Sequence, residues 1–240
     1  MQGRSRRIEA NAGQDLDVWL AARRDAGSSL GDHPRWYAER DKGRCTMHVG
    51  ELLDQVRQYY LDRFINVRDE LLAEQNSRLI LEPELRGSDG AVVTEGALQL
   101  PLRTDFAVIK DGGTKTLSID TERMLSFEPI SFIWGAGLEV RLGPFQWQAM
   151  RLQVPLPETT RWQPLQHWYW RWFKEDAGEH NEALAGAVHF LSDPEVADGG
   201  VTFAVDLGTA PVEAFEDLLD ALEMMGAKHC EIGHPEGSVV

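Results

Sequence analysis

The spacing of apolar residues changes near residue 79, and this change restricts the fold more than any other feature of the chain. Between Met47 and Glu74, apolar side chains recur at steps of three and four, which predicts one long amphipathic helix. From Leu79, apolar residues come in short runs separated by Gly, Asp and Pro, which favours strands. The pattern predicts an α+β protein in which N-terminal helices pack on a mostly antiparallel sheet.

This pattern divides the chain into three segments. Residues 1–78 form a helical segment, with further helices expected at 16–26 and after Asp32. Residues 79–174 form an antiparallel β segment, with a hairpin turn at 110–114 and a strand at 145–154, and end in an aromatic helix near Pro164. Residues 175–240 form a ββαβ unit, with strands at 187–191, 201–205 and 229–232 and a helix that Pro211 opens. We leave open whether the segments are separate domains or parts of one.

The negative charge of the chain is concentrated in the third segment. The formal net charge is -15, yet residues 175–240 hold 15 acidic side chains and only one basic side chain, Lys228. Such a field repels phosphate backbones and anionic membrane surfaces, so we expect neither nucleic acid nor membrane as a partner. The same field attracts a basic protein and speeds its encounter, although acidity can also serve solubility alone.

The strongest functional hypothesis is therefore a protein-binding module of inhibitor or immunity-protein type that engages a basic partner. The outer side of the helix after Pro211 supplies the predicted contact surface, together with one tryptophan on the aromatic helix that points away from its apolar stripe. The predicted partner-binding residues are Glu213, Glu216, Asp217, Asp220, Glu223 and Trp170.

Two alternatives stay open. One is an enzyme with an unrecognised site that draws on Asp105, Glu128 or the C-terminal histidines, because catalytic residues gather in space from distant parts of a chain. The other is a small-molecule or carbohydrate site formed by Trp162, Trp168, Trp170 and Trp172, because aromatic rings stack on sugars and bases. On balance, we expect a protein that is not an enzyme.

Motifs of cofactor sites are missing from the sequence. It contains no phosphate-binding loop, no GxGxxG, no GxSxG and no HExxH, and the histidines at 180, 189, 229 and 234 lack a metal-type spacing. We expect no metal and no other cofactor. Two distant cysteines, Cys45 and Cys230, and a basic N-terminus without an apolar run predict a soluble cytoplasmic protein without a secretory signal. The sequence predicts neither the identity of a partner nor the oligomeric state.

Overall fold

The computed structural model describes residues 48–74, 77–121, 124–156, 160–174, 184–197 and 200–233, which all lie in one compact unit. The helices predicted at 16–26 and after Asp32 fall outside these residues. The described helices are α2 (Val49–Ala73), α3 (Gln163–Phe173) and α4 (Val212–Met224). The described strands are β1 (Arg78–Leu81), β2 (Thr94–Glu95), β3 (Leu100–Pro101), β4 (Phe106–Lys110), β5 (Gly113–Leu117), β6 (Ile130–Trp134), β7 (Leu138–Leu142), β8 (Met150–Val154), β9 (Phe190–Leu191), β10 (Glu195–Ala197), β11 (Gly200–Asp206) and β12 (His229–Gly233).

The class is α+β, as the sequence predicts. The largest sheet has the order β10-β11-β8-β12-β7-β6, and β9 pairs with β11. Its pairs are antiparallel except for β12 with β7, which run parallel. A smaller sheet has the order β1-β4-β5, and β2 pairs with β3. The hairpin predicted at 110–114 is confirmed, because Lys110 of β4 pairs with Gly113 of β5.

The C-terminal segment differs from the predicted ββαβ unit, because three strands, β9, β10 and β11, precede α4 and β12, and the segment does not pair only with itself. β8 lies between β11 and β12 and is antiparallel to both, so β11, α4 and β12 form a split βαβ arrangement. Strands from residues 79–174 and from residues 175–240 therefore share one sheet.

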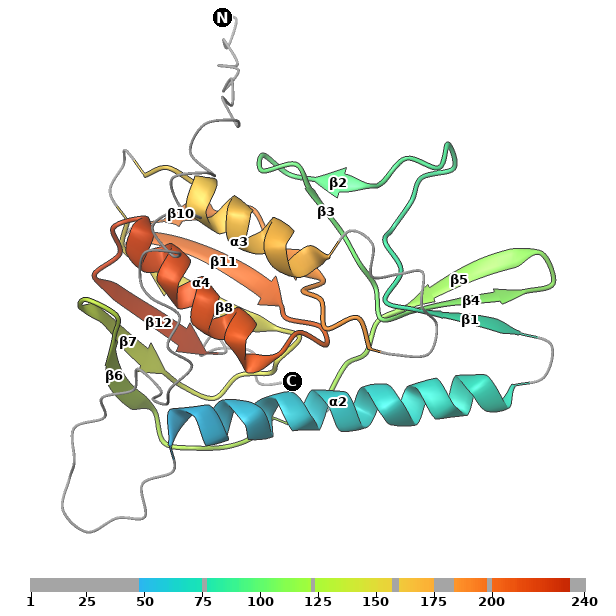
Figure 1. Ribbon diagram of the computed structural model, residues 1–240, viewed down its shortest axis with the longest axis horizontal. Helices are drawn as coiled ribbons and strands as arrows, with labels where there is room; N and C mark the ends of the chain where they lie inside the picture. The colour runs from blue at the N-terminus through green and yellow to red at the C-terminus, as the bar shows by residue number, and fades with distance from the viewer. Residues whose placement is uncertain are drawn as a thin grey trace, which may run out of the picture. The chain divides into compact units, whose positions relative to one another are not determined.

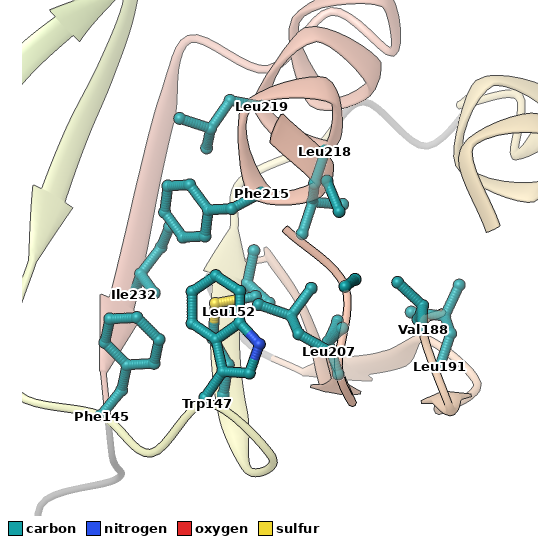
Figure 2. Close-up of a cluster of buried hydrophobic side chains, with 14 of the residues drawn as sticks. Phe145, Trp147, Leu152, Val188, Leu191, Leu207, Phe215, Leu218, Leu219 and Ile232 are labelled. Carbon is teal, nitrogen blue, oxygen red and sulfur yellow. The ribbon is translucent and has the colours of Figure 1, made fainter. Parts of the chain in front are cut away.

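The core lies between the large sheet and two helices, and α3 and α4 cover one face of that sheet (Figure 1). Buried and exposed residues alternate along β7, β8 and β12, so the face away from the helices is polar and exposed. Figure 2 shows the centre of this core, where Phe215 and Leu218 of α4 point toward Trp147, Leu152 and Ile232.

The long helix α2 agrees with the predicted 47–74 helix and packs against both parts of the fold. Its residue Phe64 contacts Phe106 of β4, with ring centroids 4.5 Å apart. Nearer its start, the Arg57 guanidinium donates hydrogen bonds to the carbonyl oxygens of Ala210 and Thr209, at 2.8 and 3.0 Å. Arg57 thereby joins α2 to the loop that leads into α4.

Two predicted strands are shorter than expected, since the strand predicted at 187–191 covers only 190–191. Three strands of the large sheet, β6, β7 and β10, were not predicted. The strand predicted at 145–154 covers only 150–154, because Phe145 and Trp147 are buried in the loop before β8. The polar residues next to them are held by side-chain bonds, since Gln146 Nε2 donates to the Thr121 carbonyl oxygen and Gln148 Nε2 donates to Thr121 Oγ1. Burial alternates along β6, but an apolar residue, Ile133, occupies an exposed position, so the sequence of this strand lacks the polar–apolar alternation.

Candidate functional site

The acidic side of α4 is the predicted contact surface, and the structure confirms the helix that carries it. α4 follows Pro211, which occupies the N-cap position with a φ of -75°. Its inward side is apolar and buried, through Ala214, Phe215, Leu218, Leu219, Ala221 and Leu222. Its other side carries Glu213, Glu216, Asp217, Asp220 and Glu223, and no Lys or Arg occurs within the helix.

One carboxylate of this row holds α4 against α3. The Trp172 indole Nε1 donates a 3.0 Å hydrogen bond to Asp217 Oδ2, and Arg171 Nη1 lies 3.0 Å from the same oxygen. Below them, the indole Nε1 of the buried Trp168 donates to the Ala214 carbonyl oxygen at 2.8 Å. Asp217 is therefore both an acidic surface residue and a structural link between the two helices.

Two further carboxylates tie α4 to the β6–β7 hairpin. The Trp134 indole Nε1 donates to Asp220 Oδ1 at 2.8 Å, and the Ala136 backbone N–H donates to Glu223 Oε1 at 2.7 Å. The neighbouring Gly135 has a φ of +54°, and a Cβ there would lie 2.2 Å from Glu223 Oε2. The hairpin thus approaches α4 closely because residue 135 has no side chain.

Trp170 lies apart from the acidic row. Trp168 and Trp172 face α4, and the helical period places Trp170 on the opposite side of α3. The Trp170 side chain is 46% exposed, and its ring meets the edge of Phe173 with centroids 6.0 Å apart. The structure therefore does not bring Trp170 together with the acidic residues. Trp168 and Trp172 are engaged in the helix interface, so the predicted tryptophan site stays a prediction that depends on Trp170.

The residues of the enzyme hypothesis separate in the structure. Glu128 is exposed on the segment before β6, whereas Asp105 is 2% exposed and lies beside His189, which is fully buried. His229 is partly exposed on β12, 3.5 Å from Glu231 and 3.9 Å from Glu139. The histidines at 180 and 234 fall outside the described residues. Asp105 and His189 are thus the only pair of this set that the described residues place in contact.

Asp105 and His189 belong to a buried polar cluster whose centre the sequence did not reveal. His189 Nε2 lies 2.9 Å from Glu82 Oε1, which also accepts a 2.6 Å bond from the Thr209 hydroxyl. His189 Nδ1 lies 3.5 Å from Asp105 Oδ1, and Asp105 accepts a hydrogen bond from the Tyr60 hydroxyl. The side chains of Glu82 and His189 are at most 1% exposed. The only local feature that marks Glu82 in the sequence is its position as an acidic residue directly after the apolar residues of β1.

Charges in this cluster shift two of its pKa values in opposite directions. Burial lowers the pKa of His189, but the hydrogen bond to Glu82 and the charges of Asp206 and Asp105 outweigh it and raise the pKa to about 9. Burial raises the pKa of Glu82, but the His189 bond and charge outweigh burial and bring the pKa below its usual value. Protonated His189 and ionised Glu82 therefore form a buried ion pair.

Metal ligation and membrane spanning find no support in the described part of the chain. No group of three His, Cys, Asp or Glu side chains among the described residues is arranged to hold a metal ion. No described helix is long and apolar enough to cross a membrane.

No protein-family model matches the chain, and no match occurs among curated proteins or solved structures.

Proposed function

We propose that this protein is a binding module for a basic protein, of inhibitor or immunity-protein type, and that the acidic side of α4 is the contact surface. The observation that most supports this proposal is the row of five carboxylates on α4, a helix that contains no Lys or Arg. The proposal includes a cytoplasmic location, which rests on the low cysteine content.

The fixed positions of three carboxylates support this proposal. Asp217, Asp220 and Glu223 each accept a hydrogen bond from a donor on a neighbouring element. These hydrogen bonds come from the Trp172 and Trp134 indoles and the Ala136 backbone N–H, and they set the positions of the three carboxylates. A surface that is already ordered loses less conformational entropy when a partner binds.

The distribution of charge on α4 should also increase the rate at which a basic protein associates with it. The acidic residues of the row face one side of α4, and Glu213 at its start is exposed. Charges of one sign on one surface accelerate the encounter with an oppositely charged protein, and salt weakens this effect. Binding through α4 should therefore depend steeply on ionic strength.

The experiment is affinity capture from the native cell with the full chain and two charge-reversed variants. Glu213→Lys changes the acidic row, and Glu70→Lys is the matched control because Glu70 is an exposed acidic residue of another helix, α2. We expect the wild type and Glu70→Lys to retain the same basic protein and Glu213→Lys to lose most of it. Association rates measured with that protein should converge between variants at about 0.5 M salt.

The proposal fails under three results. The first is a retained protein that is acidic or neutral, and the second is equal retention by Glu213→Lys and Glu70→Lys. The third is an association rate that does not change with salt.

A further inference from the structure

The buried cluster around His189 gathers residues from elements that are far apart in the chain. Glu82 and His189 are 107 positions apart, and Tyr60 adds a group from α2. Tyr169 of α3 donates to the His189 carbonyl oxygen at 3.1 Å. The titratable or charged groups that face His189 are Tyr60 of α2, Glu82 after β1, Arg103 and Asp105 before β4, Tyr169 of α3 and Asp206 of β11.

Asp206 is the third carboxyl group beside His189, after Glu82 and Asp105, and its Oδ2 lies 3.8 Å from His189 Nδ1. The nearby Arg103 bonds to the Glu82 carbonyl oxygen and pairs with the Glu84 carboxylate at 3.4 Å, so it does not offset the charge of Asp206. The Asp206 side chain is 22% exposed, against at most 2% for Glu82, Asp105 and His189. Asp206 is thus the member of the cluster that can exchange a proton with water most directly.

The same cluster anchors the two ends of the chain segment between α3 and β9. On one side, Arg103 donates to the carbonyl oxygens of Phe173 and Lys174, at 2.9 and 2.6 Å. On the other side, the Ala185 N–H donates to Glu82 Oε2 at 2.6 Å, and the Gly186 N–H donates to Thr209 Oγ1 at 2.8 Å. Ordering of residues 184–189 therefore depends on Glu82 and its partners.

We propose that Glu82, Asp105, His189 and Asp206 form a proton-dependent clasp that holds residues 184–189 against the sheet and loosens as the pH rises. His189 Nδ1 supports this proposal, because it is buried and has no hydrogen-bond partner among the described residues, although Asp105 and Asp206 lie close to it. Only the protonated ring can interact favourably with both carboxylates and with Glu82 at once.

The pKa values of His189 and Asp206 determine whether the stability of the clasp rises or falls with pH. His189 has a folded-state pKa of about 9, above its ordinary 6.5, so its contribution is complete below 6.5 and is lost as the pH rises through 9. Burial raises the pKa of Asp206 from 3.8 to about 7, against the opposing charge of His189, so the folded state loses stability as the pH rises from 3.8 and has lost this contribution above about 7. Both effects weaken the clasp between mildly acidic and alkaline pH.

The first test compares the full-length wild type with Asp206→Asn at pH 5.5 and 8.5. Asn keeps the oxygen that accepts the 2.8 Å bond from the Gly208 N–H, and it cannot ionise. We expect Asp206→Asn to lower the unfolding equilibrium constant at both pH values, and by at least about tenfold more at pH 8.5 than at pH 5.5, because the wild type loses more than one further pKa unit of stability between them. Glu70→Gln removes an exposed acidic charge of α2 that has no contact with a histidine among the described residues, and as a control it should act equally at both pH values.

The second test measures amide hydrogen exchange of the wild type between pH 5.5 and 9.5. We expect the protection factors of Ala185 and Gly186 to fall by at least about tenfold, while those of Leu152 in the centre of the sheet fall less. Equal effects of Asp206→Asn at both pH values would overturn the proposal. Protection of Ala185 and Gly186 that follows Leu152 over the whole range would overturn it as well.

Discussion

The indole N–H of Trp172 on α3 and the carboxylate of Asp217 on α4 form a 3.0 Å hydrogen bond between two helices. The aromatic side of α3 and the acidic side of α4 can each be recognised in the sequence. The contact between the two helices cannot. Because this bond lies within the proposed contact surface, its loss should affect stability as well as binding.

We predict that Trp172→Phe lowers the free energy of unfolding by about 1 kcal/mol, because the substitution removes the indole donor and leaves most of the ring packing. The measurement is urea denaturation followed by circular dichroism. Trp170→Phe is the control, since the exposed Trp170 donates no such bond in the described structure, and it should change stability by less than about 0.5 kcal/mol. Equal losses for the two variants would contradict the role of the Trp172 bond.

Gly208→Ala should destabilise the protein by about 2–4 kcal/mol, through strain at positive φ and through overpacking. Gly208 has a φ of +51°, and a Cβ there would lie 2.4 Å from His189 Cδ2 and 2.5 Å from the Ala187 carbonyl oxygen. Gly112→Ala is the matched control, because Gly112 also has a positive φ, of +79°, but its Cβ would meet nothing within 4 Å. Thermal denaturation should show the larger loss for Gly208→Ala, and similar melting temperatures would refute the predicted clash.

Cys230 should be unreactive in the folded protein. Its thiol is buried and free in the described structure, and burial, with a smaller effect from the charge of Glu231, raises its pKa far above the ordinary value. In a Cys45→Ser background, we expect a thiol reagent at pH 8 to label Cys230 only after denaturant is added. Rapid labelling without denaturant would show that β12 opens in the native state.

Phe215→Ala should cost about 3–5 kcal/mol of unfolding free energy, because it leaves a cavity in the buried core. The Phe215 ring is fully buried and stacks with Phe145 at a centroid distance of 6.3 Å (Figure 2). Phe215→Leu retains most of the volume and should cost less than about 1.5 kcal/mol. Denaturant titration of both variants measures the difference, and equal losses would show that the cavity is filled by rearrangement.

The helices could be predicted because their apolar spacing is local. Steps of three and four residues mark the buried sides of α2, α3 and α4, and all three helices occur where the pattern indicates them. The strand predicted at 145–154 is confirmed only over 150–154. Residues 145–148 alternate between apolar and polar as a strand does, but here Gln146 and Gln148 bond to Thr121 in a loop, and the sequence pattern does not distinguish the two cases.

The buried cluster and the order of the strands could not be predicted, because both depend on contacts between distant positions. Asp105 was a candidate residue and His189 one of the candidate histidines, yet Glu82, which pairs with His189, has only its place after an apolar run as a signal. The acidic row of α4 was visible in the sequence. The bonds of Asp220 and Glu223 to the β6–β7 hairpin were not, because that hairpin itself was not predicted.

The place of β12 in the large sheet has a consequence for biosynthesis. β12 is the last described strand along the chain, yet it alone joins β8 to β7. While the ribosome still holds β12, the nascent chain has two incomplete half-sheets, each with an unpaired inner edge of a kind that promotes aggregation. A stop codon between the end of β11 at Asp206 and His229 would leave those edges permanently open, so such truncated products should be insoluble or rapidly degraded.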